Sequence, residues 1–194
     1  MAAPSLRRHL LFARAARSLL RRERADDGAA AVEFALVLPI LVLILFGIID
    51  YGLWFSNSLD SRSGLEAATR RAVVANFANC TKPTDVVGSP SDHVLQIMCM
   101  VKDATGAVTG ETYVKVVLPT DPANPSNPPG WIVDQPLTVC QMIVVKGVTG
   151  YVPLPRGGVI RAQSVMQIEQ DTGQPETGGE EVLPSGLNWS WCGS

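Results

Sequence analysis

The chain has 194 residues and a net charge of −2, enough for one compact domain besides a terminal segment. The charge is uneven: residues 1–27 hold seven arginines against three acidic residues, a net +4, which leaves −6 for the remainder. Because a phosphate backbone selects basic surfaces, the acidic remainder argues against a nucleic-acid partner.

Residues 1–28 are predicted to be a basic leader that stays in the cytoplasm. Apolar residues recur among its arginines at roughly helical spacing, so the leader can form a basic amphipathic helix on a membrane surface. An organellar presequence is an alternative for an arginine-rich beginning, although such segments are not normally followed directly by a spanning helix.

An uncharged apolar run covers residues 34–49, which corresponds to about 24 Å of helix. With its weakly polar flanks the run reaches the length of a membrane span, and we expect a transmembrane helix over residues 29–55. Arginines before a single span predict a cytoplasmic N-terminus and a translocated C-terminal domain, hence a single-pass membrane protein. A secretory signal cleaved after Ser58 is the alternative, but the run is longer than a usual signal core and Trp54 and Phe55 are typical interfacial anchors.

Two residues in this helix are unusual for a membrane span. Glu33 lies near its start, where a carboxylate in hydrocarbon costs about 2.5 to 3.5 kcal/mol on insertion scales. Its charge either meets a specific partner or is solvated by headgroups at the cytoplasmic interface. Pro39 removes one backbone hydrogen bond, so we expect a bend or a locally loosened helix. That bend either allows the helix to stretch in an assembly or is only a tolerated kink.

The order of a basic leader, Gly28, Ala29, Glu33 and Phe34, with Pro39 following, resembles the class III signal of type IV pilins. It is most similar to the TadE-like pseudopilins of Flp (tight adherence) pilus systems, over roughly residues 25–75. The resemblance implies that a prepilin peptidase cuts between Gly28 and Ala29 on the cytoplasmic side. It also implies other pilins or pseudopilins, an inner-membrane assembly platform and the lipid bilayer as partners, and possible incorporation into pili.

The chemistry of this signal also follows from the residues themselves. Gly28 has no side chain, so an extended backbone there can enter a protease cleft closely. A cut after it creates an α-ammonium at Ala29, one helical turn from Glu33. Pairing the two charges, within one chain or between neighbouring subunits, removes much of the cost of keeping either in a membrane.

The helix is predicted to continue through residues 56–79, since apolar and charged residues recur on opposite stripes there. Asp50, at the outer edge of the span, is expected to be interfacial, and a pairing role across subunits is the alternative. Residues 80–170 follow as an extracytoplasmic α+β domain. It has a short helix over 91–100, strands over 112–118, 137–145 and 159–169, and an irregular strand over 151–155. The whole predicts a pilin-like fold, in which a long helix continues into an antiparallel sheet of three or four strands.

Four cysteines lie on the predicted outer side, and their even number suggests two disulfides in an oxidising compartment. Of the three possible pairings we favour Cys80 with Cys99, which flank the short helix, and Cys140 with Cys192, which ties the tail to a central strand. Free buried thiols are the alternative. No Cys-x-x-Cys spacing supports a metal site.

Residues 171–194 are expected to form a flexible tail that ends in a cluster of Trp189, Trp191 and Cys192. The cluster is either a core staple held by the disulfide or an exposed adhesive tip, and we favour the staple. No catalytic motif or cofactor signature appears in the sequence, so we expect neither enzymatic activity nor a cofactor. The expected role is that of a minor pseudopilin in Flp pilus assembly, and the alternative is a signal-anchored sensor, adaptor or binding domain.

Overall fold

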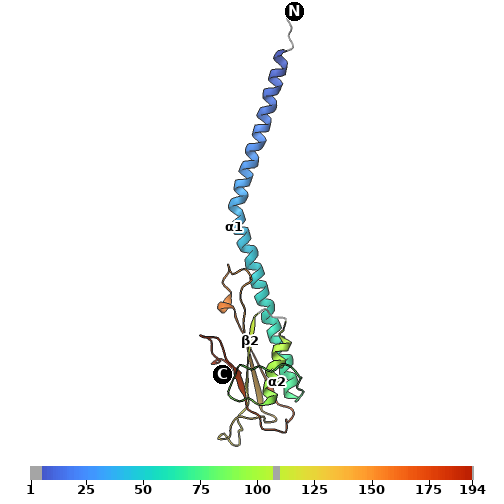
Figure 1. The fold of residues 1–194 in the computed structure, drawn as a ribbon, viewed down its shortest axis with the longest axis vertical. Helices are drawn as coiled ribbons and strands as arrows, with labels where there is room; N and C mark the ends of the chain where they lie inside the picture. The colour runs from blue at the N-terminus through green and yellow to red at the C-terminus, as the bar shows by residue number, and fades with distance from the viewer. Residues whose placement is uncertain (1–5, 107–109, 194) are drawn as a thin grey trace, which may run out of the picture. The chain divides into compact units, whose positions relative to one another are not determined.

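The computed structural model describes residues 6–106 and 110–193, with side chains from residue 28 onward. The chain divides after Ile48 into an N-terminal unit, which is helical, and a compact unit of residues 49–194 (Figure 1). We describe each unit by itself.

A single helix, α1 (Leu6–Val73), provides the described part of the first unit and continues into the second. It passes through Pro39 without a break, and its backbone includes residues 6–28 of the predicted leader, whose first five residues lie outside the described part of the chain. The helix ends where Ala75 adopts a positive φ of 53°, and the N–H of Asn76 donates to the Arg71 carbonyl oxygen at 3.0 Å. Arg70 and Arg71 place positive charge in the last turn, where the helix dipole favours it.

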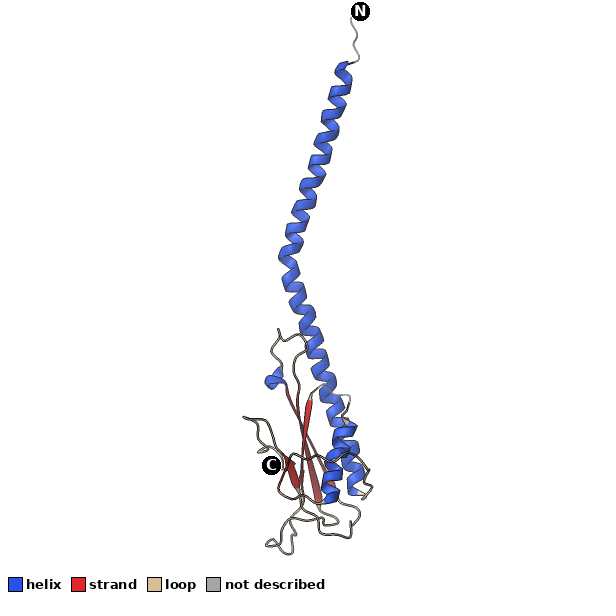
Figure 2. Cartoon of the chain, viewed as in Figure 1, coloured by secondary structure: helices blue, strands red, loops and turns tan. Residues whose placement is uncertain are grey.

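The second unit is built on a five-stranded antiparallel sheet of order β1-β5-β2-β3-β4 (Figure 2). The strands are β1 (Val86–Val87), β2 (Glu111–Val117), β3 (Pro136–Val144), β4 (Val159–Gln167) and β5 (Gly179–Glu181). A second helix, α2 (Asp92–Ala104), and a short 3₁₀ helix, η1 (Pro155–Gly158), complete the elements. The predicted α+β class is confirmed, and the three longer strands lie within two residues of their predicted bounds.

One face of the sheet packs against α1 and α2. Alternate residues of β2 point into this core, as their period of two predicts. The contributors from α1 include Leu65, Ala68 and Ala72, and those from α2 include Val94, Ile97 and Val101, all buried. The second half of α1 is therefore a core helix of this unit.

The tail covers the other face of the sheet. Trp189, 8% exposed, packs with the buried Cys140 and Met142 of β3, so the tryptophan cluster is a staple and not an exposed tip. The indole N–H of Trp189 also donates to the carbonyl oxygen of Glu181 at 3.2 Å.

The sequence analysis missed two short strands. Residues 179–181, in the expected flexible tail, form β5 between β1 and β2, so the sheet has five strands where three or four were expected. Both strands, β1 with two residues and β5 with three, are too short for a periodic pattern. The glycine and glutamates of β5 also have low strand propensity. The segment 151–155 forms no strand and leads instead into η1. Its two prolines lack the N–H groups that a sheet ladder needs.

Candidate functional site

The residues of the signal lie along α1 in the first unit. Gly28, Ala29, Glu33, Phe34 and Pro39 are all helical and exposed. A Cβ added at Gly28 meets no atom within 4 Å, so the backbone there is open to approach. Ala29 and Glu33 are four residues apart in the helix, a spacing that places their side chains on one face.

Large apolar side chains surround the helix between Glu33 and Asp50. Phe34, Ile40 and Leu43 are 60%, 63% and 64% exposed, and Leu36 reaches 73%. The helix over Gly28–Val73 is long and apolar enough to cross a membrane, and its most apolar window is not buried within the protein. Such a surface is stable in lipid or against other apolar helices, and costly in water.

Asp50 is the first charged residue after this surface, and it is held by a loop of the second unit. Its side chain is 2% exposed, and its carboxylate accepts hydrogen bonds from the backbone N–H groups of Val148 and Thr149 at 3.0 and 3.3 Å. The Thr149 hydroxyl donates to the same carboxylate. Asp50 is therefore an internal anchor of the fold, whereas its position in the sequence favoured an interfacial residue.

The loop that Asp50 holds comprises residues 145–154 and connects β3 to η1; we call it the β3–η1 loop. The hydroxyl of Tyr51 donates to the Pro153 carbonyl oxygen at 3.2 Å, a second contact between α1 and this loop. Leu154 and Trp54 pack on a cluster formed by Ile143, Val145 and Ile160. The loop is thus fixed on α1 directly after the apolar run.

The four cysteines form two pairs at bonding distance. The Cα atoms of Cys80 and Cys99 are 6.0 Å apart, and those of Cys140 and Cys192 are 5.9 Å apart. These are the two pairs that the sequence analysis favoured. The first joins the segment after α1 to α2, and the second joins the tail to the central strand β3.

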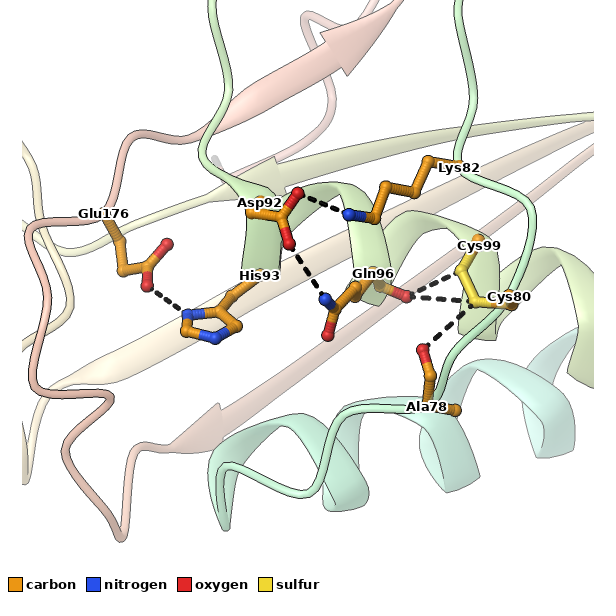
Figure 3. Close-up of polar contacts among 8 residues, drawn as sticks. All are labelled: Ala78, Cys80, Lys82, Asp92, His93, Gln96, Cys99 and Glu176. Atoms are coloured by element: carbon orange, nitrogen blue, oxygen red, sulfur yellow. Dashed lines mark hydrogen bonds and ion pairs between the residues drawn. A yellow bond between two sulfur atoms is a disulfide. The ribbon is translucent and has the colours of Figure 1, made fainter.

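The N-terminal turns of α2 gather polar contacts beside the first disulfide (Figure 3). Lys82 forms an ion pair with Asp92, and this contact lowers the pKa of Asp92 from its usual range. His93 Nδ1 lies 2.5 Å from Glu176 Oε1, and the Phe77 ring stacks on the imidazole with 4.4 Å between centroids. The Glu176 side chain is 1% exposed. This pair fastens the segment before β5 to α2.

Buried polar groups join α1, β3 and the end of α2. Ser61 donates to the side-chain oxygen of Gln141 at 3.1 Å, and the Gln141 amide donates to the Thr105 hydroxyl at 3.0 Å. All three residues are at most 2% exposed. Because the Ser61 hydroxyl and the Gln141 amide find these partners only when α1, β3 and the end of α2 are packed together, the hydrogen bonds favour one placement of this part of α1 on the sheet.

These observations define a class: an α+β protein in which a long, exposed apolar helix continues into a disulfide-bonded sheet domain. Over residues 28–73 the chain matches the family model described as TadE-like protein, so the resemblance found in the sequence is confirmed for the helix. No curated protein and no solved structure matches the chain.

The matched segment ends at Val73, the last residue of α1, so the sheet domain lies outside it. Sequence reasoning identified the TadE-like segment and favoured the two cysteine pairs. It missed the Asp50 anchor, the hydrogen bonds that join Ser61, Gln141 and Thr105, and the His93–Glu176 pair. The one signal for the Asp50 anchor was a lone carboxylate directly after an apolar run. The other two join residues 36 to 83 positions apart and have no local pattern.

Proposed function

We propose that this protein is a minor pseudopilin of a Tad (Flp) pilus system, processed by a prepilin peptidase and used in pilus assembly. The observation that carries the proposal is the TadE-like match over residues 28–73, because it coincides with the exposed apolar surface of α1. The role is structural and not enzymatic.

In this proposal the apolar part of α1 is a single inner-membrane span with its N-terminus in the cytoplasm. The arginines of the leader support that orientation through the positive-inside rule. The two cysteine pairs support a translocated second unit, since disulfides persist in oxidising compartments.

Processing releases the leader and creates a positive charge at Ala29. Glu33, four residues further along an exposed helix, offers the compensating carboxylate. When the helix enters an assembly of apolar helices, the pairing of Glu33 with the N-terminus of a neighbouring subunit satisfies both charges at one axial position. The pair therefore favours a single register between subunits.

The first test is N-terminal sequencing of the protein recovered from its native membranes. The proposal expects a mature chain that begins at Ala29. Gly28→Val should block the cut because its side chain occupies the approach to the backbone, whereas Gly47→Ala, on the same helix, should leave it intact. A chain that begins at Leu59, or one that keeps its leader beside an active peptidase, contradicts the proposal and favours a secreted domain or a plain signal anchor.

A second test separates processing from assembly. Glu33→Gln should still be cut but should lose assembly, measured by crosslinking to the other pilus components and by counting surface pili. Glu66→Gln is the matched control, because Glu66 is also exposed on α1 but lies outside the apolar surface. Equal assembly of Glu33→Gln and the wild type excludes the charge-pairing role.

A further inference from the structure

The β3–η1 loop, which is bound to Asp50, presents apolar side chains to the outside. Val148 is 68% exposed and Tyr151 is 81% exposed. The loop is anchored rather than free, because the backbone N–H groups of Val148 and Thr149 donate to Asp50. Its Leu154 packs inward on the cluster beside Trp54. One side of the loop is therefore fixed on the domain while Val148 and Tyr151 face outward.

We propose that the β3–η1 loop is a membrane-docking element that inserts Val148 and Tyr151 into the headgroup region of the outer leaflet. The inference rests on the proposed membrane anchoring of α1. Its main support is the continuity of the chain: the apolar run ends at Ile49, and the next residue, Asp50, holds the loop. A loop bound to the residue that follows a span lies at the level where that span leaves the bilayer.

The composition of the loop fits a lipid surface. Tyrosine is enriched at membrane interfaces because its ring is apolar and its hydroxyl is polar. The loop and the adjoining η1, together residues 145–158, contain two cations, Lys146 and Arg156, and no carboxylate. The chain from residue 28 onward, by contrast, carries a net −6. Both cations are exposed, so their long side chains can reach lipid phosphates while the apolar residues enter the headgroup layer.

Because the loop is anchored, it loses less conformational entropy when it docks on the membrane. Tyr51 donates to the Pro153 carbonyl oxygen, and Pro153 and Pro155 restrict the backbone on either side of Leu154. A loop already fixed in shape loses little conformational freedom when it meets the membrane. With α1 in the bilayer and the loop beside it, the second unit would contact the membrane at two places and hold a preferred orientation.

The test measures membrane depth in the full chain, reconstituted at low density in vesicles of phosphatidylethanolamine with a minority of phosphatidylglycerol. A spin label is placed on an unnatural amino acid at position 148 or 151, which leaves the cysteines untouched. Accessibility to oxygen and to a water-soluble nickel chelate then distinguishes three environments. Lipid gives high oxygen and low nickel access, water gives high nickel access, and burial in protein gives low access to both.

A label at position 165 is the matched control. Val165 is 54% exposed on β4, six residues along the strand from Val159 and thus about 20 Å from the loop end of the sheet. Position 43, on the apolar part of α1, reports insertion of the helix itself. We expect oxygen-to-nickel accessibility ratios several-fold higher at 148 and 151 than at 165.

The outcomes separate this inference from the proposed function. One outcome is that position 43 is in lipid while positions 148 and 151 are as accessible to the nickel chelate as position 165. In that case the loop does not dock on the membrane, but the membrane anchoring of α1 is supported. Low access of both probes at 148 and 151 means contact with protein and also overturns the inference. If position 43 is itself in water, the anchoring on which the inference rests has failed.

Discussion

The backbone of α1 at Gly64 lies so close to α2 that a Cβ atom added there would be 2.8 Å from the carbonyl oxygen of Ala104. The same atom would lie 2.8 Å from the Thr105 methyl group. Only glycine can be accommodated at this position. Gly64 also lies one helical turn from Ser61, the α1 residue that donates to Gln141. The helix of the TadE-like segment is thus fitted to a domain that the family match does not cover.

Replacing Gly64 should destabilise the second unit. Gly64→Ala forces a methyl group against the α2 backbone, and overpacking of this kind costs about 1 to 3 kcal/mol. We expect a lower melting temperature by near-UV circular dichroism, which reports on the packed tryptophans. Gly52→Ala is the control, because its Cβ meets nothing within 4 Å and alanine favours the helix. Equal melting of the two variants would mean that α1 shifts freely on α2.

Removing the Asp50 carboxylate should release the β3–η1 loop. Asp50→Ala leaves the N–H groups of Val148 and Thr149 without their acceptor, at a cost of about 1 to 3 kcal/mol for each group that stays buried. We expect faster tryptic cleavage after Lys146 and Arg156, the two basic residues of the region, measured by mass spectrometry of the fragments. Asp60→Ala, an exposed carboxylate on the same helix, should leave the cleavage rate unchanged.

The Glu181 side chain should be essential to the sheet although β5 is only three residues long. Its carboxylate, 4% exposed, accepts from the backbone N–H of Val114 at 2.7 Å and pairs with Lys102. Glu181→Ala leaves that N–H buried without an acceptor and should cost about 2 to 4 kcal/mol. Glu180→Ala, which removes the more exposed pair with Lys115, should cost less than about 1 kcal/mol. Chemical denaturation of both variants checks the difference.

The two disulfides should contribute unequally to stability. They close loops of 19 and 52 residues, for which the chain-entropy model gives about 3 and about 4 kcal/mol. We therefore expect Cys140→Ser with Cys192→Ser to lower the free energy of unfolding more than Cys80→Ser with Cys99→Ser. The former should also expose Trp189, seen as a red shift in its fluorescence. A larger loss from the Cys80 and Cys99 variant would show that strand packing holds the tail without its disulfide.

The stability of the folded protein at alkaline pH should depend on Tyr113. Its hydroxyl donates to Glu111 at 2.7 Å, and this hydrogen bond, together with burial, raises the pKa of Tyr113 to about 12. A raised pKa means that this contribution to stability is complete below about pH 10, the pKa of an unfolded tyrosine, and is lost as the pH rises towards 12.

Titration of tyrosinate absorbance in the folded protein measures this group. Glu111→Gln should lower the pKa of Tyr113, because it removes the negative charge beside the phenol. Tyr113→Phe should abolish the titration step near pH 12, which would assign that step to Tyr113. Persistence of that step in Tyr113→Phe would assign it to another tyrosine.

The sequence by itself determined the features that depend on local order. The uncharged run after Glu33 forms the exposed apolar surface of α1, and the period of two in β2 and β4 decides which of their side chains face the core. In β3 every residue from Leu137 to Ile143 is buried, so its sequence has no such period. The cysteine pairs also followed, because one pair flanks a short helix and the other joins the tail to a strand. For the helix and these two strands, β2 and β4, neighbouring residues carry the information.

Only the tertiary structure decided the contacts between segments distant in the chain. β5 exists because Glu181 reaches Val114 and Lys102, and its own three residues have little strand propensity. Asp50 is an anchor because a loop about 100 residues later folds against it. Such groups gain their hydrogen bonds only after the chain has folded, so no local pattern in the sequence identifies their partners.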